Sequence, residues 1–121
     1  MKIKNIKFKA KQLNSGKWFE GDLVRLGNRV CIGGDHIKDG ITDVDPSTVC
    51  MFTGLKDCEG KELFEHDLIH FIGFTHTAEM IWSEGNYAFM VVCENKHSYW
   101  LHDVIKLCRI ERIGNKFDKK K

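Results

Sequence analysis

The feature that most constrains the fold is a series of short β-forming runs separated by turn residues. After residue 66 the chain reads "DLIHFIGF", "TAEMIW", "YAFMVVC" and "SYWL", with "SEGN" and "ENK" among the connections. Strands this short, at such regular spacing, are typical of barrels and sandwiches and not of layered α/β proteins. The sequence therefore predicts a mainly β fold.

The N-terminal half shows the same pattern. Residues 6–11, "IKFKAK", alternate between apolar and lysine side chains, which predicts a half-buried strand with a lysine face suited to a sheet edge. Residues 22–34 predict two strands joined by a hairpin at Gly27-Asn28. Residues 33–47 are expected to be a loop and 48–53 a strand. Helical spacing is confined to 101–108, so at most one short helix is expected, before a last strand in "CRIERIG".

One phrase occurs twice, as "FEGDLV" at 19–24 and as "FEHDLI" at 64–69. We interpret each copy as a bend, where the aromatic residue ends one strand and the aliphatic pair begins another. Gly21 suits a positive φ, and His66 in the matching place tolerates it better than most side chains. Asp22 and Asp67 would then bond nearby backbone amides and hold the bend. Gly54 and Gly60 complete the predicted structural bends.

Charge is distributed unevenly along the 121 residues. The formal net charge of +2 combines +5 in residues 1–11, −8 in residues 12–105 and +5 in residues 106–121. The simpler interpretation is that basic ends flank an acidic body. The alternative is a nucleic-acid interface, in which basic side chains contact phosphates and exposed aromatic rings stack on bases. Its candidate residues are Lys2, Lys4, Lys7, Tyr87, Tyr99 and Trp100.

The cysteines and the N-terminal sequence indicate the cellular compartment of the protein. Five cysteines, an odd number without CxxC spacing, argue against a secreted disulfide framework. The basic start lacks the apolar stretch of a signal peptide, and no apolar run approaches the roughly 20 residues that span a bilayer. A cytoplasmic protein without membrane association is expected.

No motif predicts a catalytic, cofactor-binding or metal site. His66 and His70 lie four apart, but on a strand that separation is about 13 Å, too far for one metal ion. The acids in 57–67 are expected to form a solvated face in a turn-rich hairpin, and Cys58 to be an exposed, unreactive thiol. A hydrolase using the acids and histidines of 57–70 is the weakest alternative. The acids in question are Asp57, Glu59, Glu62, Glu65 and Asp67.

Several blocks, in order, resemble the YopX family of small proteins encoded by bacteriophages and prophages. They are "KFKAK" with "KWFEG", then "DVDPSTVCMFTGLKD", "GKELFEHD" and "IGN". The chain departs from the family pattern at His66, where members usually have glycine, and at Phe52, where tyrosine is common. The resemblance implies an N-terminal β-meander, residues 1–50, and a small Src-homology-type β-barrel, residues 51–121, sharing one core. It implies no activity.

Two functions from different classes follow. The first is a non-enzymatic protein-interaction module of a phage or prophage, with an unknown protein partner and self-association as a further option. The second is a nucleic-acid-binding accessory protein that uses the basic termini and exposed aromatics. Elution from heparin at rising salt separates the two.

Overall fold

The computed structural model describes residues 2–118 and confirms a mainly β fold. The chain divides into two compact units, residues 1–52 (unit 1) and residues 53–121 (unit 2). Each unit holds its own cluster of buried apolar side chains. No helix among residues 2–118 is long and apolar enough to cross a membrane.

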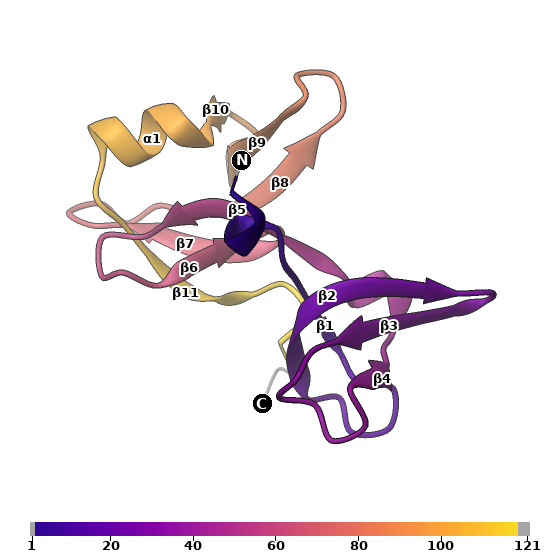
Figure 1. Ribbon diagram of the computed structural model, residues 1–121. Coiled ribbons are helices and arrows are strands. Elements are labelled where there is room, and N and C mark those ends of the chain that lie inside the picture. The colour runs from indigo at the N-terminus through magenta and orange to yellow at the C-terminus, as the bar shows by residue number, and fades with distance from the viewer. Residues whose placement is uncertain (1, 119–121) are drawn as a thin grey trace. The chain divides into compact units, whose positions relative to one another are not determined.

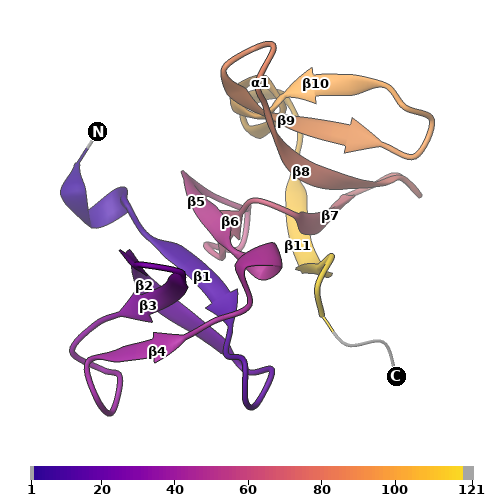
Figure 2. The same ribbon diagram turned by 90° about the vertical axis from the view of Figure 1, so that its right-hand side faces the viewer.

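Unit 1 is an antiparallel sheet in the order β4-β3-β2-β1-β5 (Figure 2). The predicted hairpin is confirmed, because Leu26 pairs with Arg29 around Gly27-Asn28. The loop expected over 33–47 contains a short additional strand, β4, which sequence periodicity did not reveal. The elements are a 3₁₀ turn at Ile3–Asn5, β1 (Phe8–Lys11), β2 (Trp18–Leu26), β3 (Arg29–Gly33), β4 (Ile41–Asp43), a 3₁₀ turn at Pro46–Thr48 and the start of β5 (Cys50–Lys56).

The prediction that residues 6–11 form an edge strand is wrong. β1 lies between β2 and β5, and pairs with both. Lys9 is only 5% exposed, and its ammonium group lies 4.7 Å from the centre of the Trp18 ring. The Lys7 ammonium lies in the same way over Phe52, at 4.9 Å. Aromatic rings therefore cover the lysine face, which lets a lysine-rich strand occupy the middle of a sheet.

Unit 2 contains a five-stranded antiparallel sheet in the open order β10-β9-β8-β7-β11 (Figure 1). The short helix predicted near 101–108 is confirmed as α1, which buries Leu101 and Val104. They join a core that includes Ile69, Met80 and Val91. The remaining elements are the end of β5, β6 (Glu62–Phe64), β7 (Asp67–Phe71), β8 (Thr77–Ser83), β9 (Ala88–Cys93), β10 (Ser98–Trp100), α1 (Leu101–Leu107) and β11 (Ile110–Asn115).

The two edge strands of this sheet, β11 and β10, differ in whether another segment of the chain covers them. Along β11, the carbonyl of Ile110 accepts a hydrogen bond from the Cys58 amide, and the Arg112 amide donates to Asp57 Oδ2 at 2.8 Å. Along β10, no hydrogen bond beyond the β9 ladder is seen within residues 2–118. One sheet end is thus covered by the hairpin that follows β5, while the other presents free backbone groups.

The doubled phrase marks the places where the chain changes strand partners. In the first copy, β2 runs without a break through Gly21, so the expected end of a strand is wrong there. Its residues up to Gly21 pair with β1, and those from Asp22 pair with β3. In the second copy a two-residue turn separates β6, the neighbour of β5, from β7, the neighbour of β8 and β11.

Candidate functional site

In unit 2, α1 runs beside β9 and β10 (Figure 1). A groove of about 510 Å³ lies there. We call it the α1 groove. The turn after β7, the edge strand β10 and the helix all contribute to it. The residues that line it are Phe71, Phe74, His76, Cys93, Asn95, Ser98, Tyr99, Trp100, Asp103, Val104, Leu107 and Cys108.

Local sequence explains why this groove is apolar. The helix begins directly after β10, with Trp100 as its N-cap residue in an extended conformation. Helical spacing turns Leu101 and Val104 into the core, which leaves Leu107 83% exposed. Phe74, in the turn after β7, is 64% exposed, and Tyr99 is 48% exposed. Large apolar side chains from three separate elements are therefore open to solvent around one hollow.

The polar lining of the α1 groove is sparse. Among the lining residues within 2–118, Asp103 is the one side chain with a formal charge. Its carboxylate Oδ1 lies 3.5 Å from His102 Nε2, and both side chains are more than half exposed. Burial, and to a lesser degree the charge of Glu94, raises the pKa of the Cys93 thiol. Cys93 therefore stays protonated at neutral pH and is not an activated nucleophile.

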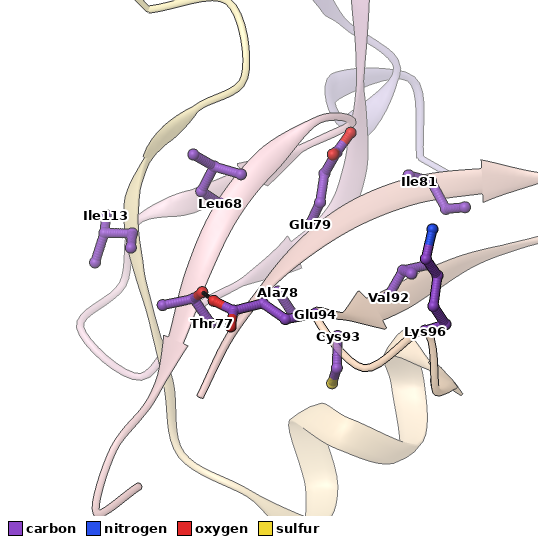
Figure 3. Close-up of a pocket in the computed structure, with 10 residues that line it drawn as sticks. All are labelled: Leu68, Thr77, Ala78, Glu79, Ile81, Val92, Cys93, Glu94, Lys96 and Ile113. Carbon is purple, nitrogen blue, oxygen red and sulfur yellow. Dashed lines mark hydrogen bonds between the residues drawn. The ribbon is translucent and has the colours of Figure 1, made fainter. Parts of the chain in front are cut away.

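A second hollow, of about 420 Å³, lies over β7, β8 and β9 (Figure 3). Leu68, Ile81, Val92 and Ile113 supply its apolar surface. Its carboxylates already have partners: Glu79 accepts from His66, and Glu94 accepts a hydrogen bond from the Thr77 hydroxyl. Lys96 also lines this hollow. Both carboxylates of the hollow are engaged within the chain, and fewer large apolar side chains are exposed around it, so the α1 groove is the better candidate for a binding site.

The structure brings two of the predicted surface residues together. Tyr99 and Trp100, from β10, both line the α1 groove. Tyr87 lies in the turn between β8 and β9, is 80% exposed, has φ of 50° and lines neither hollow.

The basic candidates belong to unit 1. Lys2 and Lys4 are exposed near the 3₁₀ turn at Ile3–Asn5, whereas Lys7 is partly buried over Phe52. The terminal run Lys119–Lys121, which carries much of the C-terminal positive charge, lies outside the described residues. The groove aromatics and the candidate lysines are thus in different units.

The acids of the 57–70 region do not all form a solvated face, so that prediction is wrong for two of them. Asp57 is 6% exposed and Asp67 is fully buried. Burial alone would raise the pKa of Asp57, but hydrogen bonds from the amides of Arg112, Lys61 and Glu59 outweigh it and lower that pKa. Both carboxylates hold backbone segments together and do not face an open site.

Asp67 joins three parts of unit 2. Its Oδ2 accepts from the Phe64 amide at 2.7 Å and lies 3.1 Å from Arg112 Nε. Its Oδ1 accepts from the Asn115 side-chain amide at 2.9 Å. Local turn chemistry predicts that Asp67 bonds nearby amides, whereas its partners almost 50 residues away cannot be read from the sequence.

The histidines of β7 and its preceding turn are engaged with carboxylates of neighbouring strands. His66 has φ of 69°, and its Nδ1 lies 2.8 Å from Glu79 Oε2. His70 Nδ1 lies 3.2 Å from Glu111 Oε1. No group of three or more His, Cys, Asp or Glu residues suited to a metal ion occurs within residues 2–118. Cys58 is exposed, and the predicted bends Gly54 and Gly60 have φ of 86° and 83°.

Phe74 and Leu107 are groove residues that were not among the candidates predicted from the sequence. Leu107 carried a signal, because it falls off the spacing of Leu101, Val104 and Ile105 and so had to lie outside the buried face of the helix. Phe74 gave none, since an aromatic residue in a turn is equally compatible with burial.

A family model described as YopX protein matches residues 7–120 of the chain. No curated protein matches it.

Proposed function

The chain belongs to the YopX family, and on that premise we propose that it binds another protein through the α1 groove and catalyses no reaction. A bacterial host cell carrying the phage or prophage is the proposed setting, and its cytoplasm the proposed location. The reduced cysteines expected from the sequence fit that compartment.

One observation carries this proposal. Phe74, Tyr99 and Leu107 come from the turn after β7, from β10 and from α1, and all three are 48% exposed or more around a single hollow. Isolated exposed apolar side chains are ordinary, but a set that lines one concave surface is typical of a protein-binding site. Burial by a partner would remove this apolar surface from water.

The groove chemistry favours binding over catalysis. A nucleophile or general base needs a partner that shifts its pKa toward neutrality. The Cys93 thiol has its pKa shifted in the opposite direction. The alternative hydrolase of residues 57–70 would need free carboxylates, and two of its five acids, Asp57 and Asp67, are occupied by backbone and side-chain donors.

The test replaces Leu107 with a photo-crosslinking phenylalanine analogue in the full chain. Irradiation in host lysate should give a discrete crosslinked product, identified by mass spectrometry. Leu13 is the matched control, because it is also a leucine, 60% exposed, in unit 1. A product from position 107 that Tyr99→Ser abolishes, with none from position 13, supports the proposal. Equal products from both positions, or none from position 107, contradict it.

The nucleic-acid alternative stays a prediction with its own measurement. It relies on Lys2, Lys4 and Lys7 and on exposed aromatics, and Lys7 is partly buried over Phe52. Neutralising Lys2 and Lys4 should then lower the slope of log affinity against log salt by about 0.7–0.9 per lost phosphate contact. Submicromolar, salt-sensitive DNA binding by the intact chain would place this function first.

A further inference from the structure

We propose that the partner of the α1 groove is an extended peptide segment, which adds as a strand to β10 and places a basic side chain against the groove aromatics and Asp103. This inference rests on the proposed function and specifies the chemistry of the partner.

The first step is the free edge of β10. Ser98–Trp100 pair with β9 on one side only, and all three residues are exposed. The opposite end of the same sheet is covered by Asp57 and Cys58. An uncovered edge strand offers alternating N–H and C=O groups to an incoming strand. Since β10 also lines the groove, a strand added there would run along the groove wall.

The second step is the composition of the groove. Phe71, Phe74, Tyr99 and Trp100 supply aromatic rings, and Asp103 supplies the one formal charge among the lining residues. Aromatic faces and a carboxylate both attract cations, and arginine or lysine also has an apolar stem suited to an apolar wall. An alternating strand that adds to β10 would direct every second side chain toward the groove.

Charge also decides against a second copy of this chain as the occupant. Two copies paired through β10 would bring two grooves together, each with Asp103 and neither with a lysine or arginine in its lining. Like charges brought together oppose such pairing. A partner that supplies a cation is complementary to the groove, and a second copy is not.

The experiment titrates the full chain, labelled with ¹⁵N, with the probe peptide acetyl-Thr-Val-Arg-Val-Thr-amide. Amide shifts of Ser98–Trp100 and of α1 should saturate with a dissociation constant below about 1 mM. The same peptide with Glu in place of Arg tests the charge. A third peptide, N-methylated on alternate amides, tests strand addition, because methylation removes the donors that an edge strand needs.

Two variants locate the cation. Asp103→Asn should weaken binding of the arginine peptide about two- to fivefold while leaving the weak binding of the glutamate peptide unchanged or stronger. Trp100→Leu should weaken binding of the arginine peptide although it leaves the charge of the groove unchanged. Spectra of the free variants check that α1 remains folded, since Asp103 lies in its first turn.

Equal affinity for the arginine and glutamate peptides would overturn the inference, as would shifts confined to other strands or unchanged binding after N-methylation. Concentration-dependent dimerisation that β10 shifts accompany would assign the edge to a second copy and overturn it too. Failure of every peptide, together with a crosslinked partner from position 107, would refute the basic-strand chemistry and leave the proposed function standing.

Discussion

Residues 19–23, "FEGDL", and residues 64–68, "FEHDL", differ at one letter, yet the first lies inside a nine-residue strand and the second forms a turn between two strands. Gly21 has φ of 158° and His66 has φ of 69°. Both positions stand where the chain exchanges one set of strand partners for another. What the two copies share is this exchange, and the backbone path through it differs.

The aspartates of the two copies show the difference most clearly. Asp22 is exposed, whereas Asp67 is fully buried and bonds Phe64 and Asn115. In the first copy, the tight feature is the glycine itself: a Cβ atom on Gly21 would lie 2.2 Å from the carbonyl oxygen of Gly33. The second copy is therefore stabilised by the Asp67 side chain, whereas the first copy requires a residue without a side chain at position 21.

The largest expected effect on stability comes from replacing the aspartate of each copy. Asp67→Ala should lower the free energy of unfolding by about 3–5 kcal/mol, because the Phe64 amide and the Asn115 side-chain amide would lose their acceptor and the buried Nε of Arg112 its ion-pair partner. Asp22→Ala, at the matching exposed position, should change it by less than about 0.5 kcal/mol. Urea titrations of both variants measure the contrast, and equal losses would contradict it.

The second largest loss of stability is expected from replacing Gly21, the glycine of the first copy. Gly21→Ala places its Cβ against a backbone oxygen that cannot move without breaking the β2–β3 ladder, so a loss of about 2–4 kcal/mol is expected. Gly27→Ala is the control, because Gly27 has φ of 59° and open space around its Cβ position. It should lose only about 1 kcal/mol, from backbone conformation alone. Similar losses at both glycines would show that close approach to β3 is unimportant.

Lowering the pH should destabilise the folded chain through Asp57, which lies in the hairpin before the second copy of the phrase. Its folded-state pKa lies below the ordinary 3.8, so its ionised form stabilises the folded chain above that pH. This contribution is lost as the pH falls below about 4 and through the lowered pKa. Asp57→Asn should cost about 1–3 kcal/mol at neutral pH and flatten the acid limb of stability. An unchanged acid limb in Asp57→Asn would count against the assignment.

The smallest expected effect on stability concerns His66, the residue at which the two copies differ. His66→Gly relieves the side chain from a left-handed backbone, but it removes the contacts with Glu79 and with the Phe117 ring, whose centre lies 5.2 Å away. Unfolded-state entropy opposes the change by up to about 1 kcal/mol, so we expect a net loss near 1 kcal/mol. His66→Asn keeps a residue suited to this backbone and isolates the ring contacts. A stabilised glycine variant would show that those contacts contribute nothing.

Patterns that depend on chain neighbours were readable in the sequence. Short β-forming runs between turn residues located most strands, Gly27-Asn28 located the β2–β3 hairpin, and helical spacing located α1. Each of these is fixed by local backbone preference and by which side chains fall on one face. The α1 groove was partly readable, since Tyr99 and Trp100 were candidates while Phe74 and Leu107 were not.

The sequence alone determined a mainly β chain with a repeated phrase, because local propensity and periodicity need no distant partner. Tertiary structure alone decided that β1 lies in the middle of a sheet with the Lys9 ammonium over the Trp18 ring, and that Asp57 reaches the amide of Arg112, 55 residues away. It also decided which sheet edge stays open. Burial and hydrogen bonding are properties of strand pairs, and the choice of pair depends on segments far apart in the chain.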